Sequence, residues 1–286
     1  MPQTHVRSAE TRGRLAGPHG DEQVVLVTGA GAGIGRAIAG AYADAGARVV
    51  AVDVASERGS SVAAELRAAG AEAEFVECDV ADDDSFAGLR EHVLSSYGHV
   101  DVLVNNVGVL QVGKPHELGL ADWRHAFEVD LLSVVRGVQA FVPSMLERGR
   151  GAVVNTCSLG ALMPVNPDGA ALVTMKAAVF GLSQSLRLTL DPLGITVVCL
   201  CPGQVRTEAH AGATAVGIRA AGFQDIELRE PEDVARAVLN AVRERRFLAV
   251  TDESHAELWA QRFQDLDAAL AADIEYLNDT PGGEDR

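Results

Sequence analysis

A glycine-rich turn between an apolar run and a helical pattern constrains this chain more than any other feature. Val24 to Val27 is continuously apolar, which is typical of a parallel strand buried on both faces. The turn contains Gly29, Gly33 and Gly35, and the chain continues as a helix towards Tyr42. Such glycines allow a tight turn, close approach of backbone to a phosphate, and close packing of helix on sheet. We predict a strand, a phosphate-binding turn and a helix whose N-terminus faces the phosphates.

A second apolar run predicts the neighbouring strand and an acidic residue at its end. The run Ala47 to Val52 ends in Asp53, 18 residues beyond Gly35. At this spacing a carboxylate meets the ribose of a bound dinucleotide, accepts hydrogen bonds from its hydroxyls and repels a 2′-phosphate. Asp53 therefore favours NAD(H) over NADP(H). Two alternatives stay open: Asp53 merely ends a strand, or the nearby Arg58 pairs with a 2′-phosphate.

Composition bounds the number of domains and the class of partner. The chain has 286 residues, 48% of them hydrophobic, and a formal net charge of −16 at pH 7. A chain of this length buries one large core, so we expect one catalytic domain. Nucleic acids and anionic membrane surfaces bind basic proteins, so the negative charge argues against both as partners. The predicted partner is a small molecule.

The two ends of the chain differ from its middle. Residues 1–22 are polar and lack the apolar centre of a signal peptide, and no apolar run in the chain reaches 18 residues. We predict a flexible N-terminal tail over 1–22, a dinucleotide-binding catalytic domain over 23–251 and a helical extension over 252–286. Cytoplasmic residence is the default expectation for such a chain.

Strand and helix patterns alternate through the middle of the chain. This alternation predicts a Rossmann-like α/β fold, in which a doubly wound parallel sheet lies between two layers of helices in a single domain. The predicted strands are 24–27, 47–52, 74–80, 100–104, 151–158, 195–201 and 247–251. The main predicted helices are about 56–69, 83–97, 123–147, 172–191, 230–241 and 254–276.

The four cysteines fall in or at the ends of predicted strands. They are Cys78, Cys157, Cys199 and Cys201, and their spacing resembles no zinc-binding motif. We expect buried free thiols and no metal site. Cys199 and Cys201 share one strand face, where a disulfide between them would be badly strained.

Polar motifs end the third and fourth predicted strands. Asp79-Val80 follows the third strand, and Asn105-Asn-Val-Gly108 follows the fourth. With the turn from Thr28 to Gly35, these motifs resemble those of the short-chain dehydrogenase/reductase family, and the resemblance covers about 23–251. Ligands gather at such strand ends, so Asp79 and the Val80 amide are expected to meet the adenine, and a helix N-cap is the alternative role of Asp79. Asn105 is expected to hold its turn closed by side-chain to backbone hydrogen bonds, and Gly108 to pass close to the ribose.

The resemblance also implies a complete cofactor site. The family's Pro-Gly turn stands here as Pro202-Gly-Gln-Val205-Arg-Thr207, where the Val205 backbone and the Thr207 hydroxyl are expected to face the nicotinamide carboxamide. The expected cofactor-binding residues are Thr28, Gly29, Gly33, Ile34, Gly35, Asp53, Asp79, Val80, Asn105, Gly108, Lys176, Pro202, Gly203, Val205 and Thr207.

The catalytic tyrosine that the resemblance implies is missing. Ser158 matches the family's substrate-orienting serine and is expected to donate a hydrogen bond to a substrate carbonyl, although a turn or helix cap is its alternative role. The family's Tyr-x-x-x-Lys stands here as Leu172-Val-Thr-Met-Lys176. The Leu172 side chain has no proton that it could exchange with a substrate. Loss of a positioned acid or base costs about 10²- to 10⁴-fold in rate. Tyr276 in the extension is an alternative donor, by folding back or reaching a partner subunit.

A second departure lies in the predicted long helix. The family usually has asparagine where this chain has Asp130. If Asp130 lies close to Lys176, each charge stabilises the other and the lysine is a poorer base. If the apolar surroundings of Leu172 dominate, desolvation favours the neutral lysine and makes it a candidate base. The sequence leaves both possibilities open, and the expected catalytic residues are Ser158, Lys176 and Asp130.

Apolar segments indicate the substrate and the assembly. The loop 159–168 predicts a pocket for a small hydrophobic or aromatic substrate, and the segment 210–228 is expected to form a mobile lid. The long helix carries an apolar stripe that is core or, by the family resemblance, a subunit interface, so we expect a homodimer or homotetramer. The loop's apolar residues are Leu162, Met163, Pro164 and Val165; the stripe is Phe127, Leu131, Val134, Val135, Val138 and Val142.

Three functions are compatible with these features. The first is a nicotinamide-dependent oxidoreductase with a rebuilt proton path, acting on a hydrophobic alcohol or carbonyl. The second is an NAD-binding isomerase, lyase, dehydratase or cyclase of secondary metabolism, without net redox. The third is a non-catalytic dinucleotide-binding subunit. Nicotinamide absorbance followed during product analysis distinguishes them.

Overall fold

One parallel sheet organises the described part of the chain. In this computed structural model, the described residues are 23–111, 113–162, 168–207, 228–251 and 260–279. The strand order is β3-β2-β1-β4-β5-β6-β7, with every pair parallel, which confirms the predicted doubly wound α/β fold. The strands are β1 (Val24–Thr28), β2 (Arg48–Asp53), β3 (Ala73–Glu77), β4 (Val102–Asn105), β5 (Gly151–Thr156), β6 (Ile195–Cys201) and β7 (Leu248–Val250).

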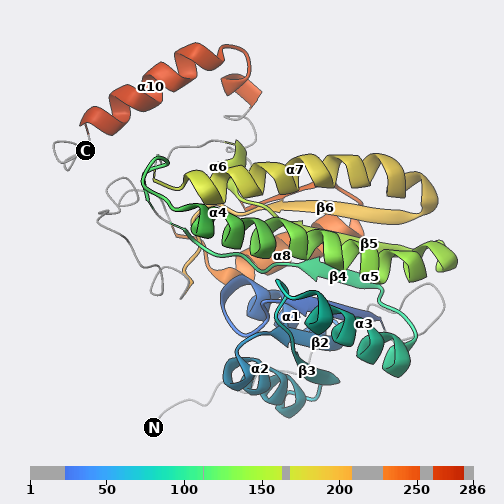
Figure 1. Cartoon of the computed structure of the whole chain (residues 1–286). Helices are drawn as coiled ribbons and strands as arrows, with labels where there is room; N and C mark the ends of the chain where they lie inside the picture. The colour runs from blue at the N-terminus through green and yellow to red at the C-terminus, as the bar shows by residue number, and fades with distance from the viewer. Residues whose placement is uncertain (1–22, 112, 163–167, 208–227, 252–259, 280–286) are drawn as a thin grey trace, which may run out of the picture.

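Helices cover both faces of this sheet (Figure 1). One face carries α1 (Gly33–Asp44) and α8 (Pro231–Arg243), which pack against each other. The other face carries α3 (Asp83–Tyr97), α5 (Ser133–Arg148) and α7 (Ala170–Leu190). The remaining helical elements are α2 (Ser56–Ala68), α4 (Leu120–Ala126), the π-helical turn η1 (Phe127–Leu132), α6 (Leu159–Leu162), the 3₁₀ turn η2 (Asp191–Leu193) and α10 (Leu266–Asp279).

The continuous apolar run of β1 is explained by burial on both faces. Val25 and Val27 pack in the core beneath α1 and α8. Val24 and Leu26 point to the opposite face and pack in the core beneath α3 and α5. Alternate residues of a strand face opposite sides, so a two-sided core requires an apolar residue at every position.

Several predicted boundaries shift in the structure. The predicted third strand extends to residue 80, but β3 ends at Glu77, so Asp79 and Val80 lie in the following loop. The predicted helix 123–147 begins three residues earlier, at Leu120, and contains η1 within it. The predicted loop after the fifth strand opens with the short helix α6. These differences concern element ends, where local propensity is weak and tertiary contacts decide.

One helical run in the described part has the length and composition of a membrane span. It is Leu120–Arg148, which comprises α4, η1 and α5, and half of its apolar window is buried inside the fold. It packs against β4, β5 and α7, as a core helix does. The run is therefore weak evidence for a membrane, and the predicted lack of a membrane partner stays a prediction.

Some predictions concern residues outside the described set. The N-terminal tail 1–22 and nearly all of the expected lid 210–228 lie outside it, as do 252–259 at the start of the expected C-terminal extension. The described helix α10 belongs to that extension and stands apart from the sheet in Figure 1.

We expect Phe141→Ala to lower the free energy of unfolding by about 3–5 kcal/mol, because it empties a large site in a close-packed core. Phe141 is fully buried in α5 among residues of β1, β4 and α3. Urea denaturation measures this loss. Leu193→Ala is the control, since Leu193 is 52% exposed in η2 and its truncation should change stability little. Equal losses in the two variants would contradict this account of the core.

Candidate active site

The loops that follow β1, β4, β5 and β6 meet at one edge of the sheet. These strands are neighbours, and β1 lies between β2 and β4, where the direction of strand progression reverses. In doubly wound sheets, ligands bind at the carboxyl ends of the strands beside such a switch point. Most of the predicted site residues follow these strands, so the topology brings them to one region.

The glycine-rich turn has the geometry of a backbone cradle. Gly29 and Gly33 have positive φ values of 65° and 52°, which glycine adopts without strain. At Gly35, a Cβ atom would lie 2.1 Å from the Gly29 carbonyl oxygen. Neighbouring Ile34 is partly buried against the core beneath α1. The turn therefore needs the residues it has, and it presents bare backbone at the start of α1, as a pyrophosphate requires.

Asp53 closes the turn from the end of β2. Its Oδ2 accepts a hydrogen bond from the Gly31 amide and its Oδ1 accepts one from the Ala55 amide, each at 2.9 Å. Each oxygen retains a lone pair that can accept from a ribose hydroxyl. A Cβ at Gly31 would lie 3.2 Å from Cβ of Arg58, so the arginine begins beside the same turn. The structure thus places both the NAD-favouring acid and its predicted competitor at one turn.

The role predicted for Asn105 belongs instead to Asn106. The Asn105 side chain is buried and donates to Asn155 Oδ1 at 2.9 Å, away from the backbone of its own turn. The Asn106 side chain donates to the Thr28 carbonyl at 3.2 Å, and the Asn106 backbone amide donates to Thr28 Oγ1 at 2.9 Å. The prediction for Asn105 was wrong because adjacent strand residues face opposite ways, and two adjacent asparagines leave the assignment open.

Asp79 and Val80 lie in the loop between β3 and α3. Asp79 is exposed, and its Oδ1 accepts from the Ala81 amide at 2.9 Å. The N-cap of α3 is Asp82, which accepts from the Ser85 amide, so Asp79 does not serve as the cap. Val80 is buried. An exposed carboxylate beyond the end of β3 is available to an adenine amino group.

The turn after β6 lies beside the glycine-rich turn. Val205 is buried and pairs with Arg229 in an isolated parallel bridge. A Cβ at Gly33 would lie 3.0 Å from Cγ2 of Thr207, so the Thr207 side chain lies next to the start of α1. Pro202 accepts a hydrogen bond from the Leu159 amide through its carbonyl, at 2.9 Å, and Gly203 follows in the same turn. This brings the expected nicotinamide segment next to the expected pyrophosphate segment.

A buried ion pair occupies the centre of the site. Lys176 Nζ lies 3.0 Å from Asp130 Oδ1, and the two side chains are 6% and 0% exposed. The same nitrogen donates to the Thr156 carbonyl oxygen at 3.2 Å. Asp130 Oδ2 accepts from the Val109 amide at 3.4 Å. Of the two possibilities left open by the sequence, this geometry is that of the paired lysine.

Two local features make room for this pair. Asp130 lies within η1, and π-helical turns, which are rare, often occur at functional sites. Gly108 faces both charges, because a Cβ there would lie 2.8 Å from Asp130 Oδ1 and 2.9 Å from Lys176 Nζ. Glycine at 108 is therefore needed to leave room for the ion pair. The sequence predicted a different reason for this glycine, which was its close approach to the ribose.

Ser158 follows β5 beside this pair, and Leu172 opens the helix that carries the lysine. Ser158 Oγ accepts from the Gly160 amide at 3.0 Å, which leaves its hydrogen for another acceptor. Leu172 lies in the first turn of α7, four residues before Lys176, and is partly buried. A Cβ at Gly160 would lie 3.3 Å from Ser158 Oγ and 3.8 Å from Cγ2 of Val173, so the serine faces the start of α7.

Neither tyrosine whose side chain is described replaces the missing phenol. Tyr42 is buried in α1, and burial raises its pKa. Tyr97 ends α3, and burial, then the Glu74 side chain, raise its pKa to about 12. The side chain of Tyr276 lies outside the described residues, so that possibility stays a prediction.

The predicted apolar loop lines the site only in part. Leu162 is buried in a core cluster with Val134 and Val179, so it packs inward, and its predicted role in lining the pocket was wrong. The inward position follows from α6, which turns this side chain towards α5 and α7. Residues 163–167, with the remaining predicted pocket residues, lie outside the described set.

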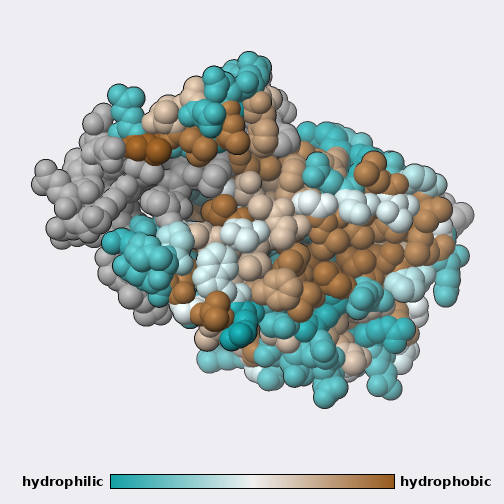
Figure 2. Space-filling view, turned by 45° about the horizontal axis from the view of Figure 1, so that its top comes forward, coloured by the Kyte–Doolittle hydropathy of each residue, from teal (hydrophilic) through white to brown (hydrophobic). Residues whose placement is uncertain are grey.

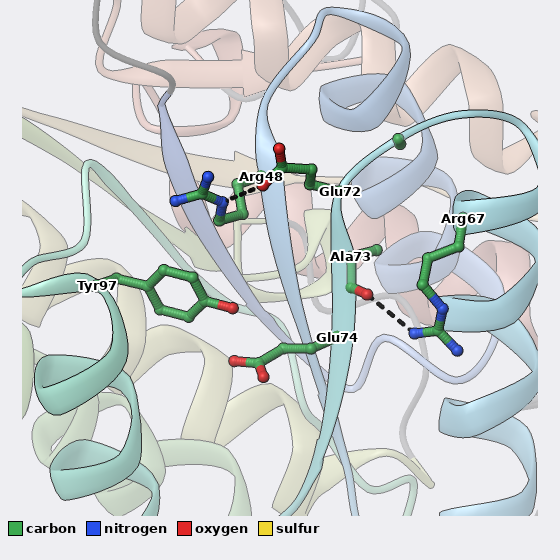
Figure 3. Close-up of a pocket in the computed structure, with 7 residues that line it drawn as sticks. Arg48, Arg67, Glu72, Ala73, Glu74 and Tyr97 are labelled. Carbon is green, nitrogen blue, oxygen red and sulfur yellow. Dashed lines mark hydrogen bonds and ion pairs between the residues drawn. The ribbon is translucent and has the colours of Figure 1, made fainter.

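A separate hollow of about 440 Å³ lies far from these strand ends (Figure 3). It is lined at the amino ends of β2 and β3 by Arg48, Glu72 and Glu74, with Tyr97 and Arg67 beside them. Arg48 pairs with Glu72 at 2.6 Å, and Arg67 donates to the Ala73 carbonyl at 2.9 Å. Its position opposite the ligand-binding edge and its internally paired charges exclude it as the catalytic centre.

Comparison with known proteins establishes the family. Residues 23–215 match the family described as short chain dehydrogenase. The chain belongs to the short-chain dehydrogenase/reductase family. A similar curated protein is the cis-4-hydroxycyclohexanecarboxylate dehydrogenase of Sinomonas cyclohexanicum, which is 40% identical over 221 residues, 76% of this chain and 88% of that protein. The protein is therefore an oxidoreductase of this family.

Solved members of the family share the fold. A short-chain dehydrogenase/reductase from Burkholderia phymatum in complex with NAD is 30% identical, with a TM-score of 0.76 over 87% of this chain and 95% of that chain. A short-chain dehydrogenase from Sphingobium yanoikuyae in complex with NADPH is 27% identical, with a TM-score of 0.75 over 90% of this chain and 95% of that one. Binding of a nicotinamide dinucleotide, NAD or NADP, is thus supported by the family.

We expect Lys176→Met to be less stable than the double variant Lys176→Met/Asp130→Asn. Removing the lysine leaves Asp130 charged and fully buried, a change that costs about 3–5 kcal/mol. Replacing both partners removes the uncompensated charge and restores much of the loss. Urea unfolding of the wild type, both single variants and the double variant measures the coupling. Additive losses would show that the pair does not act as a unit.

Proposed function

We propose that this protein is an NAD(H)-dependent dehydrogenase or reductase that acts on a hydrophobic alcohol or carbonyl by a rebuilt proton path. The observation that carries the proposal is the buried pair of Lys176 and Asp130 beside Ser158, with Leu172 at the position of the usual proton donor. The family membership supports redox chemistry, and the substitution at 172 indicates that the proton takes another route.

The nucleotide-binding part fits NAD(H). The glycine turn supplies a backbone cradle that a Cβ would fill, and Asp53 presents two carboxylate oxygens to a ribose. The remaining members of the proposed cofactor site end or follow β1, β3, β4 and β6 at the same edge of the sheet, except Lys176, which lies on α7. When bound, the nicotinamide accepts or supplies a hydride.

The catalytic residues act by orientation and charge. The Ser158 hydroxyl donates to the substrate oxygen, while its own oxygen is held by the Gly160 amide. The Lys176 ammonium has three hydrogens, donates one of them to the Thr156 carbonyl oxygen and forms an ion pair with Asp130. Its remaining hydrogens and its positive charge are available to stabilise a substrate oxyanion. We propose that water, in contact with this pair, exchanges the proton that the family's tyrosine would carry.

The proposed substrate is a small hydrophobic or aromatic molecule. The relative from Sinomonas cyclohexanicum is named for a cyclohexane ring that carries one hydroxyl and one carboxylate, so the body of that molecule is an apolar ring. In this chain the start of α7 offers Leu172 and Val173 next to Ser158. An apolar ring against these side chains would leave its oxygen close to the serine. We place the reaction in the cytoplasm, as the sequence predicts.

The proposed assembly is a homodimer or homotetramer. Figure 2 shows a broad apolar area over α5 and α7, and exposed apolar side chains in this part of the fold include Leu146 and Leu188. The predicted stripe divides here, because Val134 and Val142 are core residues whereas Phe127 is 41% exposed. Its exposed side supports a contact between subunits, while its buried side supports the ordinary core role.

A non-redox reaction is the second candidate, and Leu172 favours it, because hydrocarbon at this position removes the family's usual proton donor. In that case Ser158 polarises a carbonyl and the Asp130–Lys176 pair moves a proton. We expect nicotinamide absorbance to change in step with product across a panel of alicyclic and aromatic alcohols and ketones. Product without an absorbance change would establish the second candidate, and neither signal would favour a non-catalytic subunit.

In the same assay, we expect Leu172→Tyr to raise ketone reduction by at least about 10²-fold, since it restores a phenol four residues before the lysine on one helix face. Leu172→Phe is the matched control, because it adds the same ring without the hydroxyl. Equal rates in the two variants would show that the ring alone acts. No gain in a well-folded Leu172→Tyr variant would show that the proton donor is not what limits the rate.

We expect Asp53→Asn to weaken NADH binding by about 10- to 100-fold, the usual effect of losing hydrogen bonds to a charged acceptor. NADPH binding should weaken less or improve, because the repulsion of a 2′-phosphate is removed. Titration of cofactor fluorescence with both nucleotides measures the ratio. Asn is chosen because its oxygen can still accept from Gly31 or Ala55. An unchanged ratio would place the discrimination elsewhere, with Arg58→Ala as the next variant.

A further inference from the structure

Three cysteine thiols that are distant in sequence meet beneath the active site. Cys157 follows β5, while Cys199 and Cys201 lie on β6, and their sulfur atoms are all within 4.8 Å of one another. Cys199 Sγ and Cys201 Sγ are 3.9 Å apart. All three thiols are free and buried, as expected from the sequence, but the sequence spacing did not reveal their convergence. Parallel pairing of β5 with β6 produces it.

The spacing of the three sulfur atoms suits a single three-coordinate centre. Three sulfurs bonded at about 2.3 Å to one atom in their plane lie about 4 Å apart, and closer when the atom stands above the plane. The three sulfurs, all within 4.8 Å of one another, would need to approach by less than about 1 Å to reach this spacing. In the described part of the chain, no histidine or carboxylate joins the group, so a tetrahedral ion would lack its fourth protein ligand.

The surroundings of the cluster select the charge of the bound species. The thiols belong to an apolar cluster that also contains Val134, Leu162 and Val179. Burying a net charge in apolar surroundings is strongly unfavourable. Three thiolates around a divalent ion carry a net charge of −1, and around monovalent copper −2, whereas around a trivalent centre they are neutral. Charge thus favours a trivalent, three-coordinate thiophilic element.

Soft, thiophilic elements prefer sulfur ligands, and cysteine supplies them. Cys157 Sγ also lies 3.0 Å from the Lys176 carbonyl oxygen, to which its thiol donates. A ligand on this sulfur would replace that contact with the backbone of the catalytic lysine.

We propose that Cys157, Cys199 and Cys201 form a binding site for trivalent arsenic. Arsenous acid, As(OH)₃, is small and uncharged near neutral pH, so it can enter past the short helix α6, whose Leu159 and Ala161 pack on the cluster. Three S–H and three As–O bonds break, three As–S and three O–H bonds form, and three waters leave. Arsenic stays trivalent, so no oxidant or reductant is needed, and the product is a neutral tris-thiolate.

The test uses reduced full-length protein with sodium arsenite and native mass spectrometry. We expect one arsenic per chain, with a mass increase of one arsenic atom less three hydrogens. Cys201→Ala should lose this adduct. Cys78→Ala is the matched control, because Cys78 is an equally buried free thiol outside the cluster, and this variant should keep the adduct. Retention by Cys201→Ala, or loss in Cys78→Ala, would overturn the proposal.

Two further measurements keep the proposal falsifiable if a variant misfolds. X-ray absorption at the arsenic edge of the wild-type adduct should show three sulfur neighbours and no oxygen neighbour; an oxygen neighbour overturns the assignment. Thermal unfolding of the wild type should shift upward with arsenite, since a ligand that binds the folded state stabilises it. Zinc chloride alone should give a smaller shift, and a larger one would overturn the charge argument.

Discussion

The ion pair between Lys176 and Asp130 is the interaction on which the rest of the active site depends. Two buried charges are stable only where each has a partner and further hydrogen bonds; here Lys176 donates to the Thr156 carbonyl and Asp130 accepts from the Val109 amide. The two charges come from α7 and η1, and their hydrogen-bond partners come from β5 and from the loop after β4. Gly108 leaves the space in which the charges meet. One electrostatic requirement therefore sets the paths of four separate segments.

The pair also bears on the proton path that we propose for this protein. The chain has leucine at position 172, and the aspartate at 130 places a negative charge beside the lysine. In the proposed function this lysine orients the substrate and stabilises charge. Ser158 Oγ accepts from the Gly160 amide, which leaves its own hydrogen for another acceptor. We propose that the groups that bind a substrate oxygen are retained while its proton takes another route.

The nucleotide turn and the thiol cluster show how the parallel sheet assembles distant residues. Asn106 reaches back to Thr28 because β4 lies beside β1, and Asp53 reaches Gly31 because β2 lies on the other side. By the same principle β5 and β6 bring Cys157 to Cys199 and Cys201. Each contact joins strand ends that are neighbours in the sheet but far apart in the chain, which is how this fold concentrates chemistry along one edge.

Local sequence patterns were sufficient for the fold class, most of the strands and helices and the glycine turn. Each follows from burial of alternating strand faces, from helical periodicity or from a short contiguous motif, all of which are local properties. The tertiary structure decided four other features. Asn106 rather than Asn105 makes the turn contacts, and Leu162 packs in the core. Asp130 pairs with Lys176, and the three thiols lie together. These outcomes depend on strand register, on a π-helical turn and on packing between segments distant in the chain, and no local pattern encodes them.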